Sequence, residues 1–330
     1  MRIISLFSGA GGLDLGFKKA GAKIVWANDI DKDHGITYKH NVGDIVVEDI
    51  KKINVEDIPD ADMIIGGFPC LGFTVAKGKY RKVNDDYNFL YKEYLRVLRY
   101  KKPSYFLIEN VPGMIRGEQF KRFFDNMISE FESAGYNVKI RILNAADYGV
   151  PQKRKRVIIL GVAKGIDKEL AYPTPTHADP RLKVNLEPWI TIREAIGDLP
   201  LEECNNIPNH VATKHKVKVN NFLGNRVLKW NEPAPTIMGR GSRTGGPVIH
   251  PHPELHRRLS VRECARLQSF PDDFIFYGST SSMYAQVGDA VPPLLAFRIA
   301  QSVLSSTGYN YKKFRPEEWK LPWVKRIPSV

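Results

Sequence analysis

The feature that most constrains this chain is an alternation of short apolar runs and helical stretches over about its first 165 residues. The runs are short enough for buried strands, and apolar residues recur at helical spacing between them. We expect strands at 3–7, 23–27, 45–47, 61–66, 105–108, 138–143 and 157–162, and helices at 13–20, 87–100 and 117–134. This cadence predicts an α/β fold with a doubly wound, mostly parallel sheet, and ligand-binding loops at the carboxyl ends of its strands.

The pattern changes after Gly165, where prolines interrupt shorter apolar runs. We therefore expect three parts. A first domain covers 1–174, and a second, smaller domain covers 175–272. The last part, 273–330, is a C-terminal segment that returns to the first domain.

The charge of the chain is positive and uneven. Lys and Arg number 49 against 36 Asp and Glu, which gives a net charge of +13. Basic residues cluster at 77–82, at 153–156 and over 205–258. Such clusters suit a polyanion, because each Lys or Arg placed on a phosphate releases a counterion. Charge alone leaves two interpretations open, a nucleic-acid partner and an ordinary solvated surface.

Cysteine usage and hydropathy exclude several classes of protein. Cys70, Cys204 and Cys264 are far apart and outside any CxxC pair. We therefore expect no disulfide framework, no metal site and a reducing, cytoplasmic location. No stretch approaches the roughly 20 apolar residues of a membrane span, and the apolar start of the chain is too short for a signal peptide. We expect no membrane association.

A glycine-rich loop follows the first expected strand. Gly9-Ala10-Gly11-Gly12 opens a helix, and Asp29 comes 20 residues after Gly9, at the end of the second strand. An acidic residue in that place takes a ribose hydroxyl in dinucleotide-binding folds. The spacing GxGG rather than GxGxxG favours a nucleoside ligand without phosphates, such as S-adenosylmethionine. The alternatives are a tight strand–helix turn without a ligand and a NAD-dependent oxidoreductase.

Three further segments carry candidate reactive side chains. Cys70 follows a proline directly after the fourth strand. It could be a nucleophile or a buried structural cysteine. Glu109 ends the fifth strand, where it could act as an acid or as a hydrogen-bond partner. The alternative is a helix cap or an ion pair. Gln152, Arg154 and Arg156 share one face if their segment is extended. The alternative for these three is the charged row of an edge strand.

In this order the segments resemble the motifs of the DNA cytosine-5 methyltransferases. The likeness spans about 1–165 and 255–305, whereas 175–255 matches only in general character. The matching pieces are Phe7-Ser8-Gly9-Ala10-Gly11-Gly12, Pro69-Cys70, Glu109-Asn110-Val111, Gln152-x-Arg154-x-Arg156, Arg262-Glu263-x-x-Arg266-Leu267-Gln268 with Phe270-Pro271, and Gly288-x-Ala290-Val291-Pro292. Each motif is weak by itself, but six in this order are specific. The resemblance implies a Rossmann-like, S-adenosylmethionine-dependent methyltransferase fold with a smaller target-recognition domain.

The resemblance also implies catalytic roles. The Cys70 thiolate adds to C6 of a cytosine, which makes C5 nucleophilic toward a methyl sulfonium. Glu109 protonates or hydrogen-bonds N3 of the base. Arg154 contacts the base oxygen, and Arg156 supports Arg154. Because none of these groups reaches a stacked base, the cytosine is flipped out of the duplex.

The family's binding sites map onto two sets of residues here. The cofactor site would comprise Phe7, Gly9, Ala10, Gly11, Gly12, Asp29, Ile30, Asp49, Ile50, Pro69, Asp289 and Val291. The DNA contacts would include Lys77, Lys79, Arg81, Lys82, Arg226, Arg240 and Arg243. In the first set, Asp289 stands where the family usually has Asn, and outside both sets Leu71 stands where it usually has Gln. An Asp would repel the methionine carboxylate or attract the sulfonium, depending on which lies nearer.

The implied cofactor is S-adenosylmethionine, with S-adenosylhomocysteine as the product and no metal. The implied partner is double-stranded DNA, bound by a monomer. Within a restriction–modification system, the enzyme would protect host DNA from a cognate restriction endonuclease. A tRNA cytosine-5 methyltransferase and a catalytically inactive DNA-binding relative are the alternatives.

Overall fold

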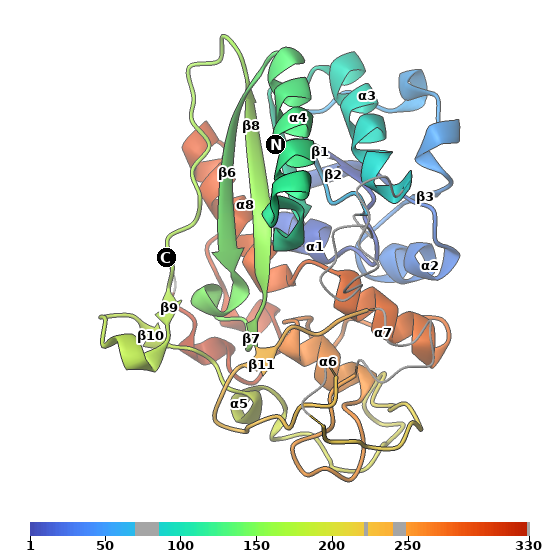
Figure 1. Cartoon of the computed structure of the whole chain (residues 1–330), viewed down its shortest axis with the longest axis vertical. Helices are drawn as coiled ribbons and strands as arrows, with labels where there is room; N and C mark the ends of the chain where they lie inside the picture. Colours follow the sequence, from blue (N-terminus) through green and yellow to red (C-terminus); the bar gives the residue numbers. More distant parts are fainter. Residues whose placement is uncertain (70–85, 221–223, 240–248, 329–330) are drawn as a thin grey trace.

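The structure is a computed structural model that describes residues 1–69, 86–220, 224–239 and 249–328 (Figure 1). Its centre is a seven-stranded sheet in the order β3-β2-β1-β4-β5-β8-β6. The strands are β1 (Arg2–Leu6), β2 (Lys23–Asp29), β3 (Val46–Val47), β4 (Met63–Gly66), β5 (Tyr105–Asn110), β6 (Tyr136–Asn144) and β8 (Lys155–Ala163). β1 to β5 pair in parallel, and β8 runs antiparallel to both of its neighbours. The predicted α/β fold with a mostly parallel sheet is confirmed.

Helices cover both faces of the sheet (Figure 1). α3 (Tyr91–Lys101) and α4 (Glu118–Ser133) pack on one face, and α1 (Gly12–Lys19) and α8 (Pro293–Thr307) on the other. The other α-helices in the described part of the chain are α2 (Lys32–Asn41), α5 (Ile192–Ile196), α6 (Val261–Leu267) and α7 (Thr280–Asp289). Neighbouring residues of a strand point to opposite faces, so Ile3 joins the core of α1 and α8, while Ile4 joins that of α3 and α4.

α2 is absent from the helices that periodicity predicts, because its sequence has no apolar stripe. Its first turn is fixed by a cap: the Asp31 side chain accepts hydrogen bonds from the backbone N–H groups of Asp33 and His34. Tyr38, 1% exposed, packs under the glycine loop, where a Cβ on Gly11 would lie 2.8 Å from the Tyr38 ring. A cap and one tertiary contact therefore position this helix.

The chain between β8 and α6 has few regular elements. It contains the short pair β9 (His177–Ala178) and β10 (Glu187–Pro188), and β11 (Ala234–Pro235) pairs with β7 (Gln152–Lys153). The carboxyl end of β6 points toward the region of β7, β11 and α6 in the lower half of Figure 1. β1, β4 and β5 run in the same direction as β6, so their carboxyl ends face this region too.

The segment after α8 lies against α1 and α8. The backbone N–H of Lys312 donates to the carbonyl of Ala20 at 2.8 Å. The Trp319 ring, 1% exposed, packs edge-on against Phe297 of α8 and lies under the ammonium of Lys19. These contacts make the C-terminal segment part of the core on that face of the sheet.

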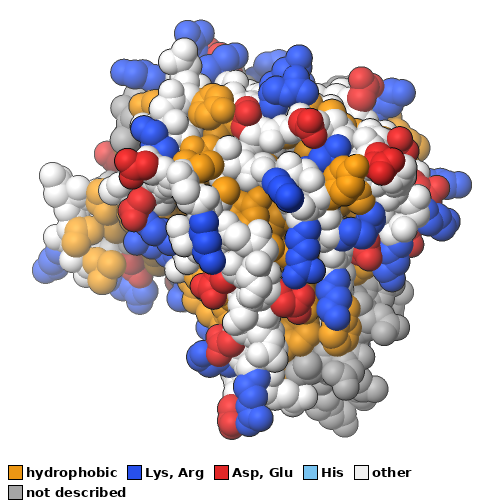
Figure 2. All heavy atoms as spheres, turned by 90° about the horizontal axis from the view of Figure 1, so that it is seen from above, with side chains coloured by type: hydrophobic (Ala, Val, Ile, Leu, Met, Phe, Trp, Pro, Cys, Tyr) orange, Lys and Arg blue, Asp and Glu red, His pale blue; other side chains and the backbone are white. Residues whose placement is uncertain are grey.

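The opposite end of the molecule has a mixed surface. In the view from above, Lys and Arg side chains lie among Asp and Glu side chains rather than in one continuous basic patch (Figure 2). At this amino-terminal edge of the sheet, the Lys101 ammonium lies 3.5 Å from an Asp60 oxygen. Within the described ranges, no helix is long and apolar enough to cross a bilayer.

The contact between α1 and α8 depends on Gly16. A Cβ at this position would lie 2.4 Å from the Ala296 Cβ and 2.5 Å from the Phe297 backbone nitrogen. Because backbone atoms cannot move aside as a flexible side chain can, we expect Gly16→Ala to lower the free energy of unfolding by about 3 kcal/mol. Urea denaturation measures this change. Lys121→Ala is the control, because the Lys121 side chain is 64% exposed and its loss should change the value by less than about 0.5 kcal/mol. Equal stability of the two variants would contradict the close packing.

Candidate active site

The glycine loop after β1 is packed on one side and open on the other. A Cβ added to Gly12 would lie 2.3 Å from the carbonyl oxygen of Val291, and Gly11 sits against Tyr38. Gly9 has a φ of +55°, and a Cβ there would meet nothing within 4 Å. The loop therefore lies close to α2 and to the turn after α7, and Gly9 leaves room for a ligand to approach the backbone.

Asp29 at the end of β2 is tied to this loop. Its Oδ2 accepts a hydrogen bond from the Gly9 backbone N–H at 2.8 Å, and its Oδ1 accepts one from the Asp31 N–H at 2.9 Å. His34 Nδ1 lies 3.4 Å from Oδ1. Burial raises the pKa of Asp29, but the His34 contact and the two backbone N–H groups outweigh it and lower that pKa overall. The carboxylate thus stays ionised at the ligand side of the sheet.

The other residues expected at the cofactor site differ in exposure. Ile30, directly after β2, is 67% exposed and offers an apolar surface. Phe7 is half-buried with a φ of 55°, whereas Ala10 and Ile50 are buried. Asp49 caps the short helical turn after it. An open glycine loop beside an exposed apolar side chain fits a nucleoside cofactor.

Glu109 at the end of β5 forms a buried ion pair with Arg156 of β8. Arg156 Nε lies 2.6 Å from Glu109 Oε1, and both side chains are about one-tenth exposed. The turn after β4 lies next to this pair, because a Cβ on Gly67 would be 3.0 Å from Glu109 Oε2. Asn110 Nδ2 donates to the carbonyl of Phe68 at 3.2 Å, which ties that turn to β5. The structure therefore brings Glu109 and Arg156 together beside the turn that leads into residue 70.

The pKa of Glu109 is raised. Burial is the largest cause, and the charge of Asp289 acts in the same direction, while Arg156 and Arg154 act against it. A carboxyl group that is easily protonated is suited to donate a proton or hydrogen bond to a ligand.

Arg154 lies deeper than Arg156. It is fully buried, and its Nη1 donates to the carbonyl of Ile237 at 2.8 Å, while its Nη2 donates to those of Gly288 at 2.7 Å and Ala290 at 3.0 Å. This geometry favours another division of roles than the expected one, in which Arg154 contacts the base and Arg156 supports it. The side chain that pairs with Glu109 is Arg156, whereas both terminal nitrogens of Arg154 donate to backbone carbonyls.

Gln152 joins the segment around Ile237 to the end of α6. Its Nε2 donates to the Leu267 carbonyl at 3.1 Å and to Gln268 Oε1 at 3.0 Å, and its Oε1 accepts from the Ile237 N–H at 2.9 Å. Gln152, Arg154 and Arg156 are all buried, whereas Lys153 is half-buried and Lys155 is exposed. The expected alternation along this segment is confirmed.

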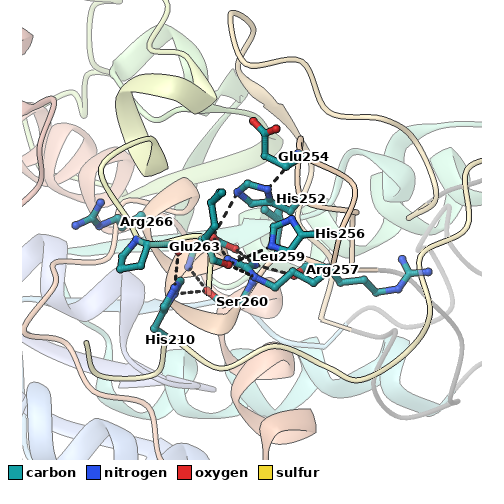
Figure 3. A network of polar contacts seen from close by, with 12 residues as sticks. His210, His252, Glu254, His256, Arg257, Leu259, Ser260, Glu263 and Arg266 are labelled. Atoms are coloured by element: carbon teal, nitrogen blue, oxygen red, sulfur yellow. Dashed lines mark hydrogen bonds and ion pairs between the residues drawn. The ribbon is translucent and has the colours of Figure 1, made fainter. Parts of the chain in front are cut away.

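α6 is fixed by a network of polar contacts (Figure 3). Glu263, 1% exposed, accepts hydrogen bonds from both terminal nitrogens of Arg257 at 2.7 Å and from the Ser260 backbone N–H at 2.7 Å. His210 Nδ1 lies 2.9 Å from Ser260 Oγ, and the His252 ring lies near Glu263. The network links the start of α6 to the segments around 210 and 252.

Asp289, at the end of α7, lies between the two halves of the site. It is exposed, and its flanking carbonyls are those that Arg154 holds. A Cβ on Gly239 would lie 2.5 Å from Asp289 Oδ1. Its charge acts both on Glu109 and on His34. Val291, two residues on, is buried against the glycine loop.

Several expected residues fall outside the described part of the chain: Cys70, Lys77, Lys79, Arg81, Lys82, Arg240 and Arg243. Pro69, directly before Cys70, is half-buried. Arg226 is exposed. Cys264 is fully buried and Cys204 is partly exposed. No cluster of His, Cys, Asp and Glu in the described segments has a geometry for a metal ion.

No role is predicted from the sequence for two residues of the site. His34 contacts Asp29 from α2, a helix that periodicity does not predict. Asn110 follows Glu109 directly, but its bond to the Phe68 turn depends on the pairing of β4 with β5. Only the neighbouring strands bring these groups to one edge of the sheet.

The fold and the edge residues together define an α/β methyltransferase class of protein. Residues 1–305 match the sequence model of the family described as C-5 cytosine-specific DNA methylase. The chain belongs to this family, and it is a DNA cytosine-5 methyltransferase.

Curated relatives match over nearly their full length. The Type II methyltransferase M.NgoFVII of Neisseria gonorrhoeae is 39% identical over 94% of this chain and 88% of its own. The Type II methyltransferase M.MthTI of Methanothermobacter thermautotrophicus is 38% identical over 92% of this chain and 97% of its own.

Solved structures share the fold. A structure described as a prophage-encoded DNA modification methyltransferase (E. coli) matches with a TM-score of 0.73 and 25% identity, over 93% of this chain and 99% of that one. The S. pombe Dnmt2 methyltransferase matches with a TM-score of 0.66 and 18% identity, over 94% and 100%. At that identity the second likeness concerns the fold alone.

The two arginines should respond differently to replacement by Lys. A Lys at 154 has its donors on one nitrogen and cannot replace Nη1 and Nη2, which reach carbonyls of two different segments, so Arg154→Lys should lower the free energy of unfolding by about 3 kcal/mol. Arg156→Lys keeps a charge beside Glu109, so it should lower stability by only about 1 kcal/mol but lower kcat roughly 10- to 100-fold. Urea denaturation and single-turnover methylation measure these values. The opposite ranking would contradict the assigned positions.

Proposed function

We propose that this enzyme transfers the methyl group of S-adenosylmethionine to C5 of a cytosine flipped out of duplex DNA, through a covalent bond between Cys70 and C6. The observation that carries the proposal is the Glu109–Arg156 pair, which lies beside the β4 turn that leads into Cys70. A carboxyl group with a raised pKa therefore lies next to the turn at Gly67 and Phe68, which precedes Cys70 in the sequence. The open glycine loop follows β1, the strand next to β4.

Cys70 and Glu109 would carry out the addition step. The Cys70 thiolate adds to C6 and forms the S–C6 bond, while Glu109 donates a proton or hydrogen bond to N3 and so stabilises the enamine. The bound S-adenosylmethionine supplies an electrophilic methyl group, which C5 takes from the sulfonium, leaving S-adenosylhomocysteine. A base then removes the C5 proton, the S–C6 bond breaks and the thiolate is restored.

Arg154 and Arg156 would have different roles. Arg156 holds the Glu109 carboxyl group and is the guanidinium that can reach the base oxygen. Arg154 instead positions the backbone around Ile237 and on both sides of Asp289. This assignment replaces the one expected from sequence.

The cofactor would lie over the glycine loop. Gly9 leaves the space for it, Asp29 offers a carboxylate to the ribose, and exposed Ile30 offers an apolar face to the adenine. The backbone from Asp289 to Val291 would close the methionine end. Phe7, Ala10, Gly11, Gly12, Asp49, Ile50 and Pro69 would shape or support the site.

DNA would bind between the sheet's carboxyl edge and the second domain. We retain the proposed division into 1–174, 175–272 and 273–330, with recognition by 175–272. Arg226, Arg240 and Arg243 would contact the target, and Lys77, Lys79, Arg81 and Lys82 the phosphates near the flipped base. Flipping a base takes a few kcal/mol, which these contacts would offset.

The curated relatives support a biological role. Both are Type II methyltransferases, so we propose that this enzyme protects host DNA within a restriction–modification system in the cytoplasm. A cognate restriction endonuclease would recognise the same DNA sequence but would not bind to the methyltransferase. The enzyme would act as a monomer.

Labelled S-adenosylmethionine tests the reaction directly. Mixed-sequence duplex DNA should gain label at cytosine C5, tRNA should gain none, and Cys70→Ser should abolish the label because a hydroxyl is a far weaker nucleophile than a thiolate. Digestion to nucleosides and chromatography identify the labelled base. Label on tRNA alone, or full activity of the variant, would refute the proposal.

The protonated form of Glu109 should set the alkaline limb of the pH profile. Because its pKa is raised, kcat/KM should fall as the pH rises through that pKa and the carboxyl group loses its proton. Glu109→Gln donates a hydrogen bond but cannot titrate, so it should lower kcat/KM by about 100-fold or more and remove that limb. An unchanged limb in the variant would show that another group titrates there.

A further inference from the structure

A short segment between α6 and α7 lies between α2 and the second domain. This link segment, residues 275–278, belongs to no helix or strand. Its backbone groups nevertheless form hydrogen bonds on two sides, with side chains in the place of neighbouring strands. The bonds alternate from one residue to the next, as the backbone groups of an extended chain do. Each side is bound by a different part of the protein.

A polar row on α2 binds the first side. Asn41 Oδ1 accepts a hydrogen bond from the Ile275 backbone N–H at 2.9 Å, and Asn41 Nδ2 donates to the Ile275 carbonyl at 2.8 Å. About one turn earlier, Thr37 Oγ1 accepts from the Tyr277 N–H at 2.9 Å. Asp33, a further turn back, lies against the end of the link segment. The spacing of four residues puts these three side chains on one face, so a helix without an apolar stripe is docked by polar contacts.

Asn209 of the second domain binds the opposite side. Its Oδ1 accepts a hydrogen bond from the Phe276 N–H at 2.9 Å, and its Nδ2 donates to the Phe276 carbonyl at 2.9 Å. The Asn209 carbonyl in turn accepts from the Arg262 N–H of α6 at 2.9 Å. Asn41 and Asn209 therefore each satisfy both backbone groups of one residue, as a neighbouring strand would.

The position of α2 matters for the proposed cofactor site. His34 of α2 lies 3.4 Å from Asp29, the carboxylate that accepts from the Gly9 N–H. The buried ring of Tyr38, also on α2, packs under Gly11. A shift of α2 would move both groups relative to the glycine loop. The contacts of the link segment oppose such a shift.

We propose that Asn41 and Asn209 are positioning residues that tie α2 to the second domain through the link segment, so that affinity for the cofactor depends on a residue outside the cofactor site. This inference rests on the proposed cofactor site. Loss of either asparagine lets α2 leave the geometry that binds the cofactor, and the apparent affinity falls with the fraction of molecules that keep it. A saturating cofactor restores that geometry, so the maximal rate of methyl transfer is largely retained.

Calorimetric titration of the full chain with S-adenosylhomocysteine, in the absence of DNA, tests this link. Asn41→Ala and Asn209→Ala should each weaken binding by about tenfold, because each removes two hydrogen bonds from the link segment. With saturating DNA, the KM for S-adenosylmethionine should rise by a similar factor, while kcat should change by less than about threefold. An unchanged affinity in Asn209→Ala would overturn the inference.

The double variant distinguishes one shared role from two independent ones. When both asparagines act through the link segment, Asn209→Ala adds little once Asn41 is already replaced. The double variant should therefore bind about 10- to 20-fold more weakly than the unaltered chain, instead of the roughly 100-fold that independent effects would give. A hundredfold loss would overturn the inference.

Tyr136→Phe is the matched control. It removes a buried hydrogen bond from the Tyr136 hydroxyl to the Pro103 carbonyl, at 2.8 Å and at the amino-terminal edge of the sheet. It should lower thermal stability and leave the affinity for S-adenosylhomocysteine unchanged. A loss of affinity as large as in the asparagine variants would reveal general destabilisation and overturn the inference.

Thr37→Val provides a second route if an alanine variant does not fold. It keeps the shape of the side chain and removes only the hydroxyl that binds the Tyr277 N–H, so binding should weaken by about threefold. Equal affinity of Thr37→Val and Tyr136→Phe would overturn the inference. No binding by the unaltered chain would refute the cofactor site itself, whereas binding that none of these variants weakens would refute only the link.

Discussion

The buried guanidinium of Arg154 is the interaction on which the active-site edge depends. The Arg154 side chain is fully buried, so its positive charge lies in the protein interior. Such a group is tolerated only where its donors are satisfied. Here three carbonyls accept hydrogen bonds from Nη1 and Nη2, while Nε has no partner among the residues that the structure describes, and these carbonyls come from segments more than 80 residues away along the chain. Removing the guanidinium would release the segment around Ile237 and the turn after α7 together.

That turn is also one wall of the glycine loop. Because the carbonyl of Val291 occupies the space beside Gly12, the position of the loop follows from the position of the turn. Gln152 strengthens the arrangement by joining Ile237 to the end of α6. Arg156, two residues beyond Arg154 and on the same face, then reaches Glu109. One short extended segment thus supplies both the structural anchor and a partner of the catalytic carboxyl group.

Sequence patterns are sufficient to predict the strands and helices in which apolar residues recur at regular spacing. The five parallel strands, α1, α3 and α4 have apolar residues at strand or helix spacing, and the structure places them as expected. α2 and α7 were missed because their positions depend on caps and on contacts with distant residues. The environments of Arg154 and Arg156 could not be predicted for a similar reason. Their spacing predicts a shared face, but only the packing of Ile237 and Gly288 decides which guanidinium is enclosed and which remains beside Glu109.

A crystal structure of the covalent complex would test this division most directly. A duplex with 5-fluorocytosine in the target sequence should trap the enzyme, because fluorine at C5 cannot leave as a proton does. We predict a Cys70–C6 bond, Glu109 at N3 with Arg156 beside it, and Arg154 still on the carbonyls of Ile237, Gly288 and Ala290. A base contacted by Arg154, with those carbonyls released and Arg156 turned away from Glu109, would contradict the account.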